Sequence, residues 1–246
     1  MNICVSLFPS SQQHKDVTVY LMHRDDQDFF AFETVSRSQT PVEIIVEALS
    51  SSKIAGHVWA FGVSNWATDR VESPTSTGFF RFNSPYFSLF EMNATRSIHA
   101  GGVQVTHSEM QDGAFQPQSF LNSYSPLGGW AIFDQPDLWR QAKQNALNNT
   151  NDPYWMNVYE AIFTDDNAAR FDRLRNFTVA FNQKHFPANY TLDQMANAYV
   201  LAHKRADFLT IGPITTDELQ RSVASLDLAR QLTDSVLDYL HGGTAQ

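Results

Sequence analysis

Polar side chains that could bind a ligand occur at the carboxyl ends of three apolar, strand-like segments of this 246-residue chain. They are an imidazole at His23, a hydroxyl and an amide at Ser64 and Asn65, and a phenol and a hydroxyl at Tyr124 and Ser125. Active sites of parallel α/β barrels form at the carboxyl ends of the strands, where the following loops converge. The pattern therefore predicts a ligand site at this edge of a parallel sheet.

Each of these residues also has a purely structural interpretation. Asn65 can cap a helix that begins at Trp66, Tyr124 can be a core aromatic residue, and Ser125 followed by proline can form an ordinary turn. His23 can be a core histidine with its hydrogen bonds satisfied, although its place directly after a strand favours the site. Taken one at a time, the residues leave both interpretations open.

A second group of candidate residues surrounds the start of the last long helix. Thr215 and Glu218 have the spacing of a capping box, in which each side chain binds the other residue's backbone amide. The amino end of a helix attracts phosphate groups, so Gly212 and Thr215 could open a helix that binds one. Gly212 followed by Pro213 is equally compatible with an ordinary strand exit.

The elements that must position these residues alternate along the chain. Strands are expected at 17–22, 58–63, 79–82, 118–124 and 208–211, with helices from Thr40, at 192–203 and from Thr215. This alternation predicts βα units around a parallel sheet in one domain over residues 1–246, with a helical insertion at 128–176. Because no glycine-rich phosphate loop follows the first strand, an incomplete (β/α)₈ barrel is an alternative to a doubly wound fold.

Composition excludes several classes of protein. A hydrophobic fraction of 43% and an aromatic fraction of 13% are those of a folded chain. The formal net charge of −9 argues against nucleic-acid binding, which needs clustered Lys and Arg. With one cysteine, Cys4, and with no signal peptide or membrane span, the sequence predicts a cytoplasmic protein. The histidines lack carboxylate or thiol partners at ligand spacing, so no metal site is expected.

Five motifs in order along the chain resemble the aldo/keto reductase family. In that family the fourth, fifth and seventh strands lead into patterns such as DLYLLHRPD, IGVSNW and YSPLG. A subgroup has SSPxFSL in the sixth strand region, and a glycine-containing loop and a helix follow the eighth strand. The matching segments here are Asp16–Asp26, Phe61–Trp66, Asn83–Leu89, Tyr124–Gly129 and Gly212–Leu219. The resemblance extends from about Asp16 to about Leu240 and implies a TIM-type barrel without its first three βα units.

The resemblance also implies roles for the residues that end the middle strands. Ser64 and Asn65 would hydrogen-bond the carboxamide of a nicotinamide cofactor, and Asn83 or Ser84 would complete that clamp. Tyr124 would stack on the nicotinamide ring, a role that suits its π surface.

Phosphate contacts are implied for the later motifs. The backbone of Ser125–Leu127, including Leu127 itself, would meet the pyrophosphate, and Gly212 and Thr215 would open the helix that holds a phosphate. Glu218 lies where many members of the family grip the 2′-phosphate of NADP, and its negative charge would weaken a preference for NADP. The cofactor is therefore expected to be NADP or NAD.

Catalysis in the family uses an aspartate, a tyrosine, a lysine and a histidine. Only His23 matches this tetrad, because the other three residues lie on the first three βα units, and residues 1–15 are a divergent segment too short to supply them. We therefore expect an oxidoreductase-like domain for a small carbonyl or alcohol substrate, with impaired turnover by this chain alone. The alternative is a non-catalytic interaction or regulatory protein that retains the cofactor cleft. The exposed edges of a five-stranded sheet predict a homo-oligomer, a partner chain, a sheet that curls differently or an incomplete gene product.

Overall fold

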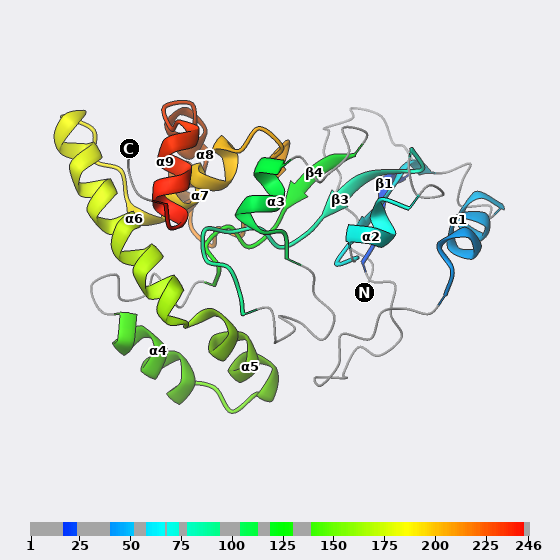
Figure 1. The fold of residues 1–246 in the computed structure, drawn as a ribbon, viewed down its shortest axis with the longest axis horizontal. Coiled ribbons are helices and arrows are strands. Elements are labelled where there is room, and N and C mark those ends of the chain that lie inside the picture. Colours follow the sequence, from blue (N-terminus) through cyan, green and yellow to red (C-terminus); the bar gives the residue numbers. More distant parts are fainter. Residues whose placement is uncertain are drawn as a thin grey trace.

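The computed structural model describes residues 17–23, 40–51, 58–66, 68–73, 78–93, 104–112, 119–129 and 139–243. The expected divergent segment at residues 1–15 lies outside these ranges. Five parallel strands form one sheet in the order β1-β2-β3-β4-β5, of which β1, β3 and β4 are labelled in Figure 1. This is the order that successive βα units produce around a barrel. Among the described residues, β1 and β5 are the outer strands and do not pair with each other, so the barrel is not closed.

The five expected strands are all present, and each observed end lies within two residues of the expected one. Their bounds are β1 (Val17–Met22), β2 (Val58–Ser64), β3 (Phe80–Ser84), β4 (Phe120–Ser123) and β5 (Phe208–Leu209). One irregularity matters for the site. Phe61 of β2 pairs with Phe80 and Gly62 pairs with Phe82, so Arg81 is an extra residue in β3. Such a bulge reverses the direction in which the following side chains point.

Helices cover one face of the sheet and extend beyond its end (Figure 1). They are α1 (Val42–Ser51), α2 (Thr68–Val71), α3 (His107–Asp112), α4 (Trp139–Asn148), α5 (Pro153–Ile162), α6 (Asp165–Lys184), α7 (Leu192–Ala202), α8 (Thr216–Ala229) and α9 (Asp234–His241). The segment expected as a helical insertion contains α4, α5 and the first part of α6. The largest buried apolar cluster joins α5–α9 to the segments that follow β3 and β4.

One expectation about a helix is wrong. Asn65 does not cap a helix beginning at Trp66, because α2 begins at Thr68 and Asn65 has a left-handed backbone (φ 59°) instead of the extended one of a helix cap. In α8 the apolar residues Leu219 and Val223 lie on a face of the helix that is not the buried one. Leu219 and Val223 are 45% and 55% exposed, whereas the helix buries its Ser225 side against the core.

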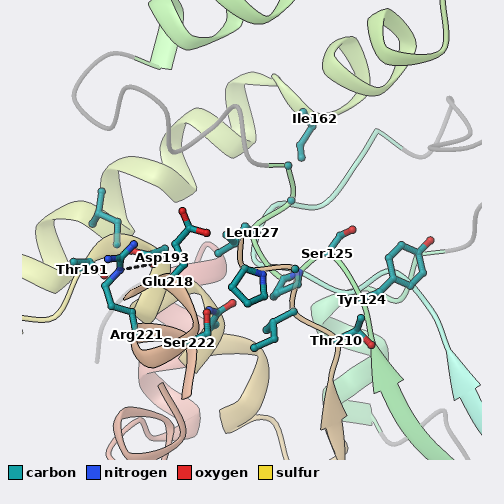
Figure 2. Close-up of a pocket in the computed structure, with 18 of the residues that line it drawn as sticks. Tyr124, Ser125, Leu127, Ile162, Thr191, Asp193, Thr210, Glu218, Arg221 and Ser222 are labelled. Atoms are coloured by element: carbon teal, nitrogen blue, oxygen red, sulfur yellow. Dashed lines mark hydrogen bonds and ion pairs between the residues drawn. The ribbon is translucent and has the colours of Figure 1, made fainter. Parts of the chain in front are cut away.

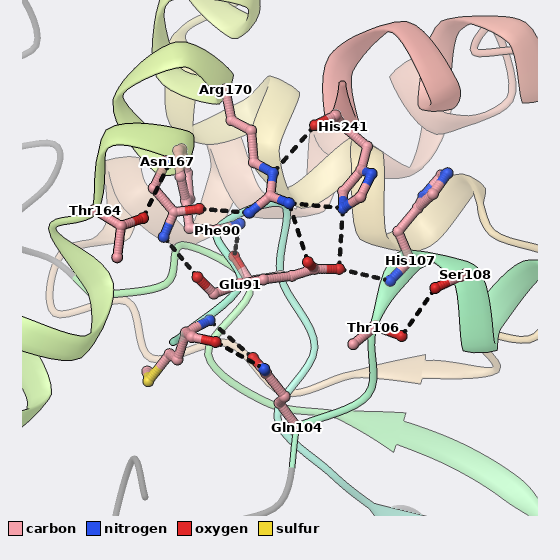
Figure 3. A network of polar contacts seen from close by, with 12 residues as sticks. Phe90, Glu91, Gln104, Thr106, His107, Ser108, Thr164, Asn167, Arg170 and His241 are labelled. Atoms are coloured by element: carbon pink, nitrogen blue, oxygen red, sulfur yellow. Dashed lines mark hydrogen bonds and ion pairs between the residues drawn. The ribbon is translucent and has the colours of Figure 1, made fainter. Parts of the chain in front are cut away.

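A buried polar cluster attaches the C-terminal helix α9 to α6 and to the segment after β3 (Figure 3). Arg170 of α6 donates to Glu91 (3.0 Å), to Asn167 Oδ1 (2.8 Å) and to the backbone oxygen of His241 (3.1 Å). Glu91 also lies 3.0 Å from His241 Nε2 and accepts from the backbone N–H of His107. Three separate segments therefore meet at one carboxylate, whose contribution to stability depends on its ionisation.

Glu91 makes stability depend on pH. Burial raises its pKa, but hydrogen bonds from His241 and the His107 backbone, together with the Arg170 charge, lower the pKa from 4.5 to about 2. A carboxylate with a depressed pKa stabilises the fold fully above about pH 4.5, and this contribution is lost as the pH falls toward 2. We expect Glu91→Gln to reduce the free energy of unfolding at pH 7 by about 3 kcal/mol. The difference from the wild-type protein should shrink between pH 4.5 and 2 in urea unfolding curves; a constant difference would contradict this assignment.

Candidate active site

The inner face of the sheet changes from apolar to polar toward the carboxyl ends of the strands. One inward layer is apolar and in register across four strands: Leu21, Gly62, Phe82 and Phe120. Alternation of side chains along each strand places the next inward layer two residues further on. That layer is polar: His23, Ser64, Ser84 and Asn122. The site therefore lies at the end of the sheet where parallel α/β barrels hold their active sites.

A row of hydrogen bonds crosses this layer. Tyr124 donates its hydroxyl to Asn65 Oδ1 at 2.5 Å, and Asn65 Nδ2 lies 3.4 Å from His23 Nε2 and 3.3 Å from Ser64 Oγ. The phenol ring of Tyr124 packs edge-on against Tyr86, with the ring centroids 6.0 Å apart. Four residues that the sequence singled out from three different strands are thus brought together.

Two residues of the site hold a backbone conformation that most side chains avoid. Asn65 has φ 59° and Ser125 has φ 54°, and both values lie in the left-handed region. Asparagine tolerates this region because its short polar side chain can compensate locally, whereas serine does so less readily. Non-glycine residues in this conformation cluster at functional sites, where the surrounding fold maintains them.

The structure separates the two residues that were expected to complete the clamp. Ser84 is in register with Ser64 on the inner face, and Ser64 donates its hydroxyl to the Ser84 backbone oxygen at 2.8 Å. Asn83 is in register with Val63 and Leu121, on the face that packs against the helices. Its Oδ1 is buried without a hydrogen-bond partner. Only Ser84 therefore lies beside the hydrogen-bonded row.

A cavity of about 1100 Å³ opens beside Tyr124 (Figure 2). Five of the expected cofactor residues line it: Tyr124, Ser125, Leu127, Gly212 and Glu218. One wall is apolar and contains Val158, Ile162 and Val179 of α5 and α6. The other is polar and is built from α7 and α8. The cavity is at the upper end of the range for ligand sites and is large enough for an extended molecule.

The start of α8 is occupied by the protein's own carboxylate. Glu218 Oε2 accepts from the backbone N–H of Ile214 at 2.7 Å and from that of Thr215 at 3.3 Å. Thr215 Oγ1 in turn accepts from the Glu218 backbone N–H at 3.2 Å, which confirms the expected capping box. Thr215 does not line the cavity, whereas Glu218 does. An anion approaching this helix end meets a negative charge already in place.

Several polar residues of the site were missed from the sequence. Thr210 donates to Asn122 Oδ1 at 3.0 Å on the inner face, and Arg221 of α8 forms an ion pair with Asp193 of α7 at 3.4 Å in the cavity wall. Alternation could have identified Asn122, because it lies two residues before Tyr124 and so shares its face. Asn197, which also lines the cavity, had no comparable signal, because its position depends on how α7 packs.

Two further kinds of feature do not occur in the described ranges. No group of three or more His, Cys, Asp or Glu side chains is placed there to hold a metal ion. No helix among the residues that the structure describes is long and apolar enough to cross a membrane.

Neither a protein-family model nor a curated protein sequence matches the chain. Solved structures do resemble it. A glycerol dehydrogenase from Gluconobacter oxydans matches with a TM-score of 0.54 and 13% identity over 94% of this chain and 61% of its own. The holo form of an aldo-keto reductase from Bacillus halodurans matches with a TM-score of 0.52 and 13% identity, over 94% and 62%. The chain thus spans about three fifths of the length of these two structures, and its fold is that of part of an aldo-keto reductase barrel.

Proposed function

We propose that the chain binds a nicotinamide dinucleotide and a small carbonyl or alcohol substrate at the carboxyl end of its sheet. The observation that carries the proposal is the hydrogen-bonded row of His23, Asn65 and Tyr124, of which Tyr124 also lines the cavity. The row offers an amide for the carboxamide, an aromatic ring for the nicotinamide face and an imidazole for the substrate oxygen. When bound, the nicotinamide supplies or accepts the hydride.

The shape of the site fits the other parts of such a cofactor. The backbone of Ser125–Leu127 borders the cavity directly after the row, where it can meet the pyrophosphate. Gly212 borders the same space, and a Cβ added at this position would meet nothing within 4 Å. The polar wall of α7 and α8 then remains for the adenosine. Each segment of an extended dinucleotide therefore has a matching surface.

We propose NAD rather than NADP as the cofactor. The backbone N–H groups at the start of α8 are already bound by Glu218, whose carboxylate also lines the cavity. A 2′-phosphate near this position would be repelled by that charge and would find the helix end occupied. A ribose hydroxyl can instead donate to the same carboxylate.

The alternative function is that of a non-catalytic protein that retains the cofactor cleft. One observation favours it, because the polar atoms of Asn65 already contact Tyr124, Ser64 and His23 without a ligand. We propose that turnover by this chain alone is impaired, since only His23 matches the family's catalytic residues. Oxidation of NADH in the presence of small aldehydes separates the two functions.

We further propose that a second copy or a partner chain covers β1, β5 and the exposed face of α8.

Cofactor binding is tested by titrating the folded protein with NADH and NADPH while following tryptophan fluorescence. We expect saturable quenching with NADH favoured, and binding about tenfold weaker in Tyr124→Ala, because the ring platform is lost. Tyr124→Phe is the matched control and should retain most of the affinity. Asn65→Gly removes the amide while keeping the left-handed backbone, and should also weaken binding. If the folded wild-type protein binds neither dinucleotide, the proposal is wrong.

A further inference from the structure

Three histidines, His107 of α3, His203 at the end of α7 and His241 of α9, form a histidine cluster beside the Glu91 carboxylate. His107 Nδ1 lies 3.1 Å from His203 Nε2, and the His107 ring stacks on that of His241 with the centroids 4.4 Å apart (Figure 3). Both His107 and His203 are buried. Histidine is the side chain that ordinarily changes charge between about pH 5 and 8, so this cluster makes the contacts of α9 sensitive to protons.

The hydrogen-bond partners of His107 and His203 fix where their protons lie. His203 Nδ1 lies 2.8 Å from the Tyr199 backbone oxygen, and His107 Nε2 lies 3.0 Å from Asp238 Oδ1. Carbonyl and carboxylate oxygens only accept hydrogen bonds, so each of these two nitrogens carries a proton. While both rings are neutral, the facing nitrogens His107 Nδ1 and His203 Nε2 are therefore unprotonated, and the Tyr199 hydroxyl donates to His107 Nδ1 at 2.8 Å. The contact between the rings can take up one proton but not two.

The titratable and charged groups around the histidine cluster come from each element packed against it. They are Tyr199 of α7, Asp234 and Asp238 of α9, Glu91 after β3, Arg170 of α6, which binds both Glu91 and His241, and Lys204, which pairs with Asp234. Burial lowers the pKa of His203 to about 4, against the raising effects of the Tyr199 backbone oxygen and of Asp234. Burial also lowers the pKa of His107, against the hydrogen bond to Asp238. Both imidazoles are therefore neutral at pH 7.

We propose that the histidine cluster is an acid-sensitive switch that releases helix α9 when the pH falls below about 6. With α9 in place, His107 and His203 together hold at most one proton. Once α9 has moved away, each ring is exposed to water and takes up a proton of its own. Because only the released state binds the second proton, acid favours release. A charge on His107 also lies against the stacked ring of His241, which opposes charging both rings while α9 is docked.

Hydrogen exchange followed by mass spectrometry tests the release on the wild-type protein, without any nucleotide. Between about pH 7.5 and 5, we expect the protection factor of α9 to fall about thirtyfold for one histidine of ordinary pKa that takes up a proton only on release. The protection factor of α6, corrected in the same way for the intrinsic effect of pH on exchange, should change much less. Glu91 does not contribute in this range, because its pKa is about 2. Equal falls in α9 and α6 would overturn the proposal, since acid would then act on the whole fold.

His203→Asn assigns the effect to the histidine cluster, because the asparagine amide can still donate to the Tyr199 backbone oxygen but does not titrate. The fall in α9 protection should shrink to about threefold, because His107 no longer shares its proton site. His185→Asn is the matched control: this histidine is exposed directly after α6, and its variant should keep the wild-type fall.

Asp238→Asn tests the same cluster from its exposed side and serves also if His203→Asn does not fold. The Asp238 side chain is 51% exposed, and its charge favours a proton on His107. Without that charge the docked state binds protons less well, so the loss of α9 protection at acid pH should be larger than in the wild-type protein. A wild-type fall in His203→Asn, or a smaller fall in Asp238→Asn, would overturn the proposal.

Discussion

Replacing Arg170 by methionine is expected to lower the free energy of unfolding by about 3–5 kcal/mol. The guanidinium is buried, and its removal leaves the largely buried Glu91 carboxylate without its cationic partner. It also removes the donors to Asn167 Oδ1 and to the backbone oxygen of His241. Removing one partner of a buried ion pair is costly because the other charge stays desolvated. Chemical denaturation followed by circular dichroism measures the loss.

Arg175→Met on the same helix is the matched control. Its side chain is 38% exposed and pairs with Asp172, whose side chain is 62% exposed, so the loss should stay below about 1 kcal/mol. The double variant Arg170→Met with Glu91→Gln should recover part of the loss, because no unpaired charge remains. If Arg170→Met costs no more than Arg175→Met, the polar cluster does not hold α9 in place.

Most of the fold could be predicted because local patterns determine it. Each strand is a short apolar run, and the capping box at Thr215 is found where the sequence predicted it. The exposed apolar face of α8 shows what a sequence pattern cannot predict. Its apolar spacing indicates a face, but the neighbours of that face are set by tertiary structure.

The sequence predicts which residues lie at the carboxyl ends of the strands. It does not predict which face of a strand each side chain occupies after a bulge. Counted by alternation from Phe80, whose ring packs with the helices, Asn83 would point inward and Ser84 outward. The extra residue at Arg81 reverses this order, so Ser84 joins the inner layer. A bulge depends on how two strands pair, and no local feature of β3 shows it.

The second large effect is expected at Gly62, which lies in the apolar layer directly below the polar one. A Cβ at this position would lie 2.5 Å from Leu21 Cδ2, 2.7 Å from Phe82 Cβ and 2.7 Å from the Phe82 backbone oxygen. The Leu21 side chain can turn away, but the β3 backbone moves only if the strand pairing moves. We therefore expect Gly62→Ala to cost about 3 kcal/mol of unfolding free energy. Gly212→Ala is the control and should be neutral or stabilising by up to about 1 kcal/mol, since its Cβ meets nothing within 4 Å.

Gly62→Ala should also disturb the geometry of the candidate site, because the apolar and polar layers lie on the same strands. Moving β2 away from β3 lengthens the 2.8 Å hydrogen bond from Ser64 to the Ser84 backbone and displaces Asn65, which directly follows β2. NADH affinity should then fall in the fraction of Gly62→Ala that remains folded at low temperature, although residue 62 carries no side chain that could touch a ligand. Thermal unfolding measures the loss of stability, and fluorescence titration with NADH measures the loss of affinity separately. Full affinity in a destabilised Gly62→Ala would mean that the polar layer is positioned independently of the packing beneath it.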